Sequence, residues 1–302
     1  MDRREALGFL GTAALAAALP GRVQGSPALI TRAIPSSGER IPVVGLGTWI
    51  TFDVGGAESP ARRARGDILA AFFEAGGRLV DSSPMYGSAE EVIGAELARL
   101  ANAPLFSATK VWTVGGLAGR RQMEHSRGLW RRNRLDLMQV HNLLDWESHW
   151  PTLKAWKAEG RFRYIGMTTS HGRRHDDLEK IIRRERLDFV QLTYNMVDRE
   201  VEDRLLPAAA ERGAAVIVNR PFDGGALFGK LHGKPLPGWA KEIGCATWAA
   251  ALLKWIASHA AVTCAIPATS QLAHLRENVA ALQGPLPDAA LRRRMLADYE
   301  RA

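Results

Sequence analysis

The chain has 302 residues, of which 46% are hydrophobic, and it carries a formal net charge of +8 at pH 7. The length exceeds the roughly 250 residues of a typical α/β barrel by a modest margin, which favours one large domain with a short extra segment. A net positive charge can favour binding to nucleic acids or to anionic membranes. Here the arginines are scattered over many predicted helices, without a stripe of interleaved aromatics. We therefore expect a solvated basic surface and no nucleic-acid partner.

The first residues form a separate unit. Arg3 and Arg4 are adjacent, an apolar stretch occupies residues 8–19, and Pro20 follows. This layout is typical of an export signal, and the paired arginines resemble the twin-arginine type. The stretch is shorter than the roughly 20 residues that cross a bilayer, so we expect no permanent membrane anchor. The sequence predicts a signal over residues 1–25 that engages the export machinery and leads to the periplasm, with a cytoplasmic location as the alternative.

Strand-like and helix-like segments alternate over residues 26–302, the predicted enzyme domain. The strand-like runs lie at residues 43–47, 79–82, 105–110, 137–141, 164–168, 189–192, 215–219 and 262–267. Between them lie amphipathic stretches whose apolar residues recur at spacings of three and four. This alternation implies parallel strands with right-handed crossovers, and eight strands predict a (β/α)8 TIM barrel of the α/β class. Residues 28–41, with turn residues between two apolar arms, predict a hairpin that closes the barrel floor.

An open doubly wound sheet is the runner-up architecture. It requires a glycine-rich phosphate fingerprint after its first strand. The first predicted strand offers only Gly45 and Gly47, with Trp49 beyond them and no third glycine leading into a helix. We therefore reject this alternative.

Cysteine and histidine usage predicts neither a disulfide framework nor a metal site. Cys245 and Cys264 are expected to be two buried thiols, although a disulfide is possible in an exported protein. His171 and His175 have a spacing of four, but the pair starts in a loop and lacks the carboxylate expected of a zinc helix. We expect no bound metal.

Four residues stand where predicted strands give way to loops: Asp81, Tyr86, Lys110 and His141. The carboxyl ends of barrel strands form the mouth at which active sites lie. A nearby ammonium favours phenolate, so a Lys110 paired with Asp81 is expected to lower the pKa of Tyr86 and make it a proton donor. A neutral His141 can hold a carbonyl oxygen. The combination predicts carbonyl reduction.

These residues also carry a family resemblance. Residues 81–94, which contain Asp81 and the motif MYGSAEEVIG, are followed by FSATKVW, LDLMQVHNL, FVQLTYN and IPATSQLAHLREN in the order and approximate spacing of the aldo-keto reductases. The chain resembles that family over nearly all of its length after the signal. The resemblance implies reduction of an aldehyde or ketone to an alcohol with NAD(P)H, bound without a Rossmann domain. It implies that Tyr86 is the general acid, that Lys110 and Asp81 tune it, and that His141 orients the substrate.

The resemblance further assigns cofactor contacts. It places Gln191 on the nicotinamide carboxamide and Asp81 near the ribose, while Thr168 and Thr169 replace the family's Ser-Asn pair. Arg220 stands where many relatives carry a nicotinamide-stacking Tyr, and it can stack through its planar guanidinium or bind the pyrophosphate. The implied cofactor-binding residues are Gly47, Thr48, Asp81, Thr168, Thr169, Gln191, Asn219, Arg220, Pro221, Phe222, Thr269, Ser270, His274, Glu277 and Asn278.

The segment IPATSQLAHLREN bears on the choice between NADP(H) and NAD(H). Relatives with a strong NADPH preference carry Lys-Ser and a later Arg here, whereas this chain has Ala268, Thr269 and His274. Ser270 and Arg276 are candidate replacements for the lost contacts to the 2′-phosphate. The resemblance favours NADP(H) and leaves NAD(H) open.

Aromatic and apolar residues after the first four strands predict a pocket for a small-molecule carbonyl substrate. The expected wall consists of Trp49, Phe52, Met85, Trp112, His141 and Trp146. Such a wall suits a small or aromatic aldehyde or ketone. Two other functions stay open: a nicotinamide-binding regulatory barrel with little turnover, and a non-redox enzyme that uses Lys110 to form a Schiff base.

Overall fold

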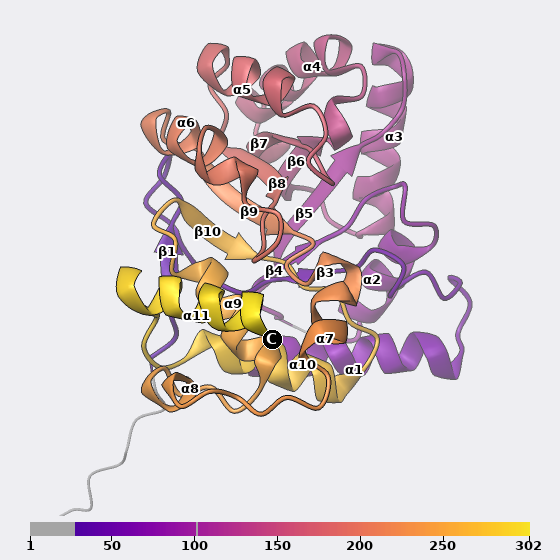
Figure 1. Cartoon of the computed structure of the whole chain (residues 1–302). Helices are drawn as coiled ribbons and strands as arrows, with labels where there is room; N and C mark the ends of the chain where they lie inside the picture. Colours follow the sequence, from indigo (N-terminus) through magenta and orange to yellow (C-terminus); the bar gives the residue numbers. More distant parts are fainter. Residues whose placement is uncertain (1–27, 101) are drawn as a thin grey trace, which may run out of the picture.

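The structure is a computed structural model that describes residues 28–100 and 102–302. At its centre, eight parallel strands form a curled sheet with helices on its outer side (Figure 1). The strands are β3 (Leu46–Gly47), β4 (Leu79–Asp81), β5 (Phe106–Val111), β6 (Leu135–Val140), β7 (Phe162–Thr168), β8 (Phe189–Thr193), β9 (Ala215–Asn219) and β10 (Val262–Ala265). Each pairs with the next along the chain. The predicted signal, residues 1–25, lies outside the described residues.

The barrel closes at a seam between its first and last strands. Isolated parallel bridges join Val44 to Ala265 and Gly47 to Ala268. A Cβ at Gly47 would lie 2.7 Å from the carbonyl oxygen of Ile266, a distance that real Cβ atoms do not tolerate. Glycine at this position therefore permits the close backbone approach that the seam requires.

Helices surround the barrel (Figure 1). They are α1 (Pro60–Glu74), α2 (Ala89–Leu97), α3 (Gly116–Leu129), α4 (Trp146–Ala158), α5 (His175–Arg184), α6 (Leu205–Glu211), α7 (Ala226–Leu231), α8 (Trp239–Glu242), α9 (Trp248–Ala257), α10 (Leu272–Val279) and α11 (Ala289–Arg301), with 3₁₀ turns η1 (His141–Leu143), η2 (Glu200–Glu202), η3 (Asp223–Gly225) and η4 (Ala280–Leu282). Within residues 28–100 and 102–302, no helix is both long enough and apolar enough to cross a membrane.

Several helices begin where the local sequence provides a cap. Ser59 accepts a hydrogen bond from the Arg62 N–H at the start of α1, and Pro60 occupies the first helical position. Asp288 caps α11 in the same way through the Leu291 N–H. Such caps satisfy N–H groups that have no partner within the helix.

The eight predicted strands and the predicted barrel are confirmed. The main difference is the length of the first strand, which was expected over residues 43–47 and is assigned only at Leu46–Gly47. The chain before it still hydrogen-bonds to the last strand, since the Gly45 N–H donates to the Ala265 carbonyl at 2.8 Å. Irregular pairing at the seam accounts for the shorter strand.

The predicted hairpin is also present. Its strands β1 (Thr31–Ala33) and β2 (Arg40–Pro42) are antiparallel. Ile34 and Ile41 belong to the same buried cluster as inward-facing barrel residues, including Phe106 and Phe189. The Tyr164 hydroxyl, on β7, adds a 2.8 Å hydrogen bond to a carboxylate oxygen of Glu39 in the hairpin turn. The hairpin thus closes the barrel at the end opposite the carboxyl ends of the strands.

Candidate active site

A cavity of about 680 Å³ opens at the carboxyl ends of the strands, and we refer to it as the mouth cavity. Asp81 at the end of β4, Tyr86 in the following loop and His141 after β6 all line it. Lys110 of β5 is completely buried and contacts Asp81. The structure therefore brings the four sequence-predicted residues together. The volume lies within the range usual for small-molecule and cofactor sites.

A buried ion pair lies beneath the mouth cavity. The Lys110 Nζ donates to Asp81 Oδ2 and, at 2.7 Å, to the carbonyl oxygen of Ser82. The other Asp81 oxygen accepts from the side-chain amides of Gln191 at 3.0 Å and Gln139 at 3.2 Å. Burial alone would lower the pKa of Lys110, but attraction to Asp81 and Tyr86 raises it above its ordinary value. Lys110 is therefore a fixed positive charge near neutral pH.

Tyr86 lies over this charge. The Lys110 Nζ is 5.0 Å from the centroid of its ring. Burial raises the pKa of the Tyr86 hydroxyl, and this effect outweighs the opposing attraction of Lys110. The expected net lowering of the Tyr86 pKa is thus wrong in direction. Burial is the main reason, and the negative charge of Asp81 adds to it by opposing phenolate formation.

His141 adjoins Tyr86 with its ring edge-on, since the two ring centroids are 5.7 Å apart and the planes meet at 84°. Burial, reinforced by repulsion from Lys110, holds the pKa of His141 well below its usual value. The imidazole is therefore neutral near pH 7, as expected from the sequence. Its Nδ1 lies 2.9 Å from the hydroxyl oxygen of Ser83.

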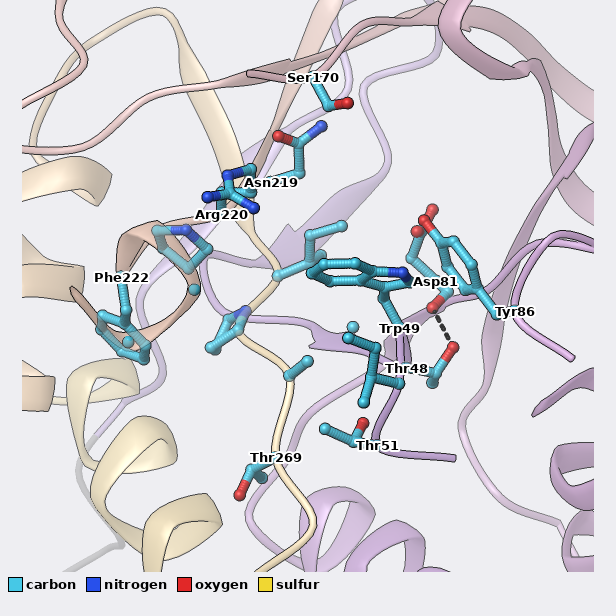
Figure 2. A pocket seen from close by; sticks show the side chains of 18 of the residues that line it. Thr48, Trp49, Thr51, Asp81, Tyr86, Ser170, Asn219, Arg220, Phe222 and Thr269 are labelled. Atoms are coloured by element: carbon cyan, nitrogen blue, oxygen red, sulfur yellow. Dashed lines mark hydrogen bonds between the residues drawn. The ribbon is translucent and has the colours of Figure 1, made fainter. Parts of the chain in front are cut away.

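Most of the residues implied as cofactor contacts line the mouth cavity. They are Gly47, Thr48, Asp81, Thr168, Gln191, Asn219, Arg220, Pro221, Phe222, Thr269, His274, Glu277 and Asn278. Figure 2 shows Asp81 and Tyr86 on one side of the cavity and Arg220 and Phe222 on the other, with Trp49 between them.

Two implied contacts, Thr169 and Ser270, are not among the lining residues. Thr169 is buried behind the wall, and Ser270 is exposed on the surface. Alternating side-chain directions explain the first case, because Thr168 already points into the cavity and its neighbour points away. Arg276, a candidate partner for a 2′-phosphate, is likewise exposed and does not line the cavity.

An amide network joins the strand ends. Asn219 donates from Nδ2 to the carbonyl oxygen of Thr169 at 2.8 Å, and its Oδ1 accepts from the Thr193 hydroxyl at 2.7 Å. Its Nδ2 also lies 3.4 Å from Gln191 Oε1. These bonds connect Asn219 through Gln191 to Asp81, so the network orders the floor of the cavity around the buried ion pair.

Arg220 lines the cavity in a constrained backbone position with φ of 48°. Its guanidinium forms a 2.7 Å ion pair with Asp223, and its carbonyl oxygen accepts from the amide of Asn195. Beside it, the rings of Phe222 and Phe228 lie 4.9 Å apart. The loop after β9 thus presents a planar cation and an aromatic pair to the cavity.

The predicted substrate wall is only partly present. Trp49, Met85 and His141 line the cavity. Phe52 and Trp146 instead lie in the hydrophobic core, and Trp112 is exposed outside the lining. Spacing after a strand locates a loop but does not fix the direction of each side chain, which is why these three do not line the cavity.

Several lining residues were missed by sequence reasoning. Asn142 follows His141 in a left-handed conformation, and its Oδ1 accepts from the Ser170 hydroxyl at 3.2 Å. Ser170 and His171 also line the cavity, as do Ile50 and Thr51. Asn142 and Ser170 could have been found, because each lies within two residues of a predicted strand end.

Metal-binding side chains do not gather in the part of the chain that the structure describes. His175 lies beside Glu200, with 3.4 Å between Nδ1 and a carboxylate oxygen. Cys245 and Cys264 are both free and buried.

The protein thus combines an eight-stranded α/β barrel, a cavity at the carboxyl ends of its strands and a buried Lys110–Asp81 pair beneath that cavity. A family model described as the aldo/keto reductase family matches residues 43–294. The chain belongs to the aldo/keto reductase family, and it is an NAD(P)-dependent oxidoreductase.

Similar proteins cover most of the chain. The methylglyoxal reductase YeaE of Escherichia coli (strain K12) is 29% identical over 261 residues, which span 83% of this chain and 89% of the relative. The NADH-specific methylglyoxal reductase of the same organism is 26% identical over 320 residues, 85% of this chain and 95% of the relative. An aldo-keto reductase from Klebsiella pneumoniae, solved in complex with NADPH, superposes with a TM-score of 0.70 at 24% identity, covering 91% and 95% of the two chains.

Proposed function

We propose that this protein reduces a small aldehyde or ketone to an alcohol with NADPH or NADH, and that Tyr86 is the general acid. The observation that carries this proposal is the position of Tyr86 at the mouth cavity, directly over the charged Lys110 and next to a neutral His141. A proton donor and a hydrogen-bond donor to oxygen are the two protein groups that carbonyl reduction requires.

The cavity fits a nicotinamide dinucleotide. Gly47 lines the cavity, and the Thr51 hydroxyl is buried with no hydrogen-bond partner among the described residues. Arg220 can face the pyrophosphate or stack on a ring. Thr168 also lines the cavity, and its hydroxyl oxygen accepts from the Asn142 N–H at 2.9 Å. When bound, the reduced nicotinamide supplies the hydride, and the chemistry of that transfer belongs to the cofactor.

The protein supplies the proton and holds the carbonyl oxygen. Because its pKa is raised by burial, Tyr86 keeps its hydroxyl proton near neutral pH and can donate it to the substrate oxygen. The Lys110 ammonium then stabilises the phenolate that forms. The neutral His141 can donate a hydrogen bond to the same oxygen, which fixes the carbonyl against Tyr86.

We propose methylglyoxal as the first substrate to assay, since two relatives are named methylglyoxal reductases. Trp49 and Met85 expose apolar surface at the cavity. They favour a small carbonyl compound with an apolar group. The raised pKa of Lys110 disfavours the Schiff-base alternative, because a protonated amine is not a nucleophile.

Cofactor choice is proposed to be permissive. Ala268, Thr269 and His274 line the cavity, whereas no lysine of the described residues belongs to its lining and the exposed Arg276 lies outside it. At this end the lining offers hydroxyl and imidazole groups to a 2′-phosphate, and the nearby cation Arg65 donates to the carbonyl oxygens of Thr51 and Ser270. We expect NADPH to bind with at most a small advantage over NADH.

We further propose that residues 1–25 act as a removable twin-arginine export signal that takes the enzyme to the periplasm. The support is Arg3 and Arg4 together with the short apolar stretch. Mature protein isolated from its host should begin near Ser26. An intact N-terminus on soluble cytoplasmic enzyme would contradict export.

The test of the main proposal is turnover. Purified protein is mixed with NADPH or NADH and a panel of aldehydes and ketones, and both cofactor oxidation and the alcohol product are measured. Cofactor binding without turnover of any compound would favour the regulatory barrel. Borohydride trapping of substrate on Lys110 would instead support the Schiff-base enzyme.

A further inference from the structure

The two ring nitrogens of His141 have different surroundings. Nδ1 lies 2.9 Å from the Ser83 hydroxyl oxygen. Nε2 forms no hydrogen bond with any of the described residues, and His141 lines the mouth cavity. A carbonyl substrate in the cavity therefore meets Nε2, which can hold the carbonyl oxygen only if it carries the ring proton.

The hydrogen bonds of Ser83 decide where that proton lies. A serine hydroxyl has one hydrogen and two acceptor lone pairs. The Met85 N–H donates to one lone pair at 3.2 Å, and Ser83 is completely buried. Apart from Nδ1, no acceptor for its hydrogen exists among the described residues. If Nδ1 carried the ring proton, the Ser83 hydrogen would be buried without a partner.

An unpaired buried donor biases such an equilibrium by roughly 5- to 150-fold. We propose that Ser83 is a positioning residue: it donates its hydroxyl hydrogen to Nδ1 of His141 and thereby fixes the Nε2–H tautomer that faces the substrate. This inference rests on the proposed carbonyl reduction. Ser83 itself does not touch the substrate; it acts through the imidazole.

The same residue also holds the general acid. The Tyr86 N–H donates to the carbonyl oxygen of Ser83 at 2.9 Å. Ser83 therefore fixes the turn that carries Tyr86 through its backbone and the ring of His141 through its side chain. One residue of the loop after β4 thus sets the distance between the proton donor and the oxygen-holding imidazole.

The experiment compares Ser83→Ala with wild type by kinetics and by ¹⁵N NMR of the histidine side chains. The His141 signals are assigned with His141→Asn. We expect wild type to show the Nε2–H tautomer and Ser83→Ala to show a mixture of tautomers. We also expect kcat to fall about 3- to 10-fold in Ser83→Ala, with cofactor affinity unchanged, and Ser83→Thr to restore both readouts because it keeps the hydroxyl.

Ser126→Ala is the matched control. Its hydroxyl is equally buried and donates a 2.9 Å hydrogen bond, but to Glu90 and not to His141. We expect this variant to leave the His141 signals and kcat unchanged. An Nδ1–H tautomer in wild type, or an unchanged tautomer and kcat in Ser83→Ala, would overturn the inference. Loss of reduction in Tyr86→Phe would leave the proposed function standing in that case.

Discussion

Two completely buried lysines occupy different regions of this protein. Lys110 lies under the mouth cavity and pairs with the carboxylate of Asp81. Lys254 lies in α9 on the outside of the barrel, and within the described part of the chain it donates only to the backbone carbonyls of Ile243 and Pro285. Burial acts on both, yet the pKa of Lys110 is raised and that of Lys254 is lowered.

The difference shows what a carboxylate partner does. Burial penalises the ammonium form at both sites, and attraction to an opposite charge reverses the direction of the pKa shift only at Lys110. Lys254 behaves as a structural donor that ties α9 to the chain segments after α8 and η4. Lys110 holds a permanent charge beside Tyr86, the proton donor of the proposed reduction.

The largest effect on kcat is expected for Tyr86, whose ring lies over Lys110. Tyr86→Phe removes the transferable proton and should lower kcat for carbonyl reduction by about 10²- to 10⁴-fold, the usual contribution of a general acid. Cofactor affinity, measured by fluorescence titration, should change little because the ring remains. Reduction of a reactive aldehyde at the wild-type rate would contradict the role of Tyr86.

Replacing each lysine by methionine tests whether only the lysine with a carboxylate partner supports catalysis. Lys110→Met should abolish reduction and destabilise the fold by about 3–5 kcal/mol, because it leaves Asp81 buried without its cation. Lys254→Met should keep kcat and lose only the hydrogen bonds to two carbonyl groups. Steady-state kinetics and urea unfolding of both variants provide the measurement. Equal losses of kcat in the two variants would show that the Lys110 ammonium contributes no more to reduction than the Lys254 ammonium does.

The pH dependence of stability should differ in sign between the two sites. The pKa of Lys110 is raised in the fold, so its contribution is full below the ordinary value of 10.5 and is lost as pH rises through the folded pKa. The pKa of Lys254 is lowered, so stability increases as pH rises from the folded pKa toward 10.5. Unfolding free energies of wild type and each Met variant, measured at rising pH, should show these opposite slopes. Contributions of the two lysines to the unfolding free energy that change with pH in the same direction would contradict their opposite pKa shifts.

The smallest effect concerns the end of the cavity near Thr269 and His274, where no lysine or arginine of the described residues belongs to the lining. A lost charge-assisted hydrogen bond weakens binding by about 1.5 to 3 kcal/mol, or one to two decades in affinity. NADPH should therefore bind less than about 100-fold more tightly than NADH. Arg276→Ala should alter this ratio by less than about threefold, because Arg276 is exposed outside the lining. A several-thousandfold preference in fluorescence titrations would mean that another cation holds the 2′-phosphate.

Regular periodicity explains why the barrel was predictable from the sequence. Strands such as β6 and β8 are short apolar runs between amphipathic helices, and such runs alternate through the chain. Tyr86 and His141 could be placed because strand ends converge at one face of the barrel. The hairpin followed from turn residues between two apolar arms.

Side-chain direction and competing charges could not be predicted in this way. Phe52 and Trp146 follow strands, as the lining residue Trp49 does, but their loops turn them into the core. The pKa of Tyr86 depends on how completely it is buried and how fully Asp81 offsets Lys110. The bond between Ser83 and His141 joins two strand ends and requires three-dimensional placement.

The seam of the barrel has a consequence for folding kinetics. Val44 and Ala265 meet there although nearly the whole domain separates them along the chain, so joining them closes a long loop, which costs entropy and is slow. Gly47 and Thr269 flank this seam and both line the mouth cavity. A dinucleotide that spans them would bind the closed barrel better than an open one. Bound cofactor should then stabilise the contact between the first and last strands. This should slow hydrogen exchange of the Gly45 and Gly47 amides.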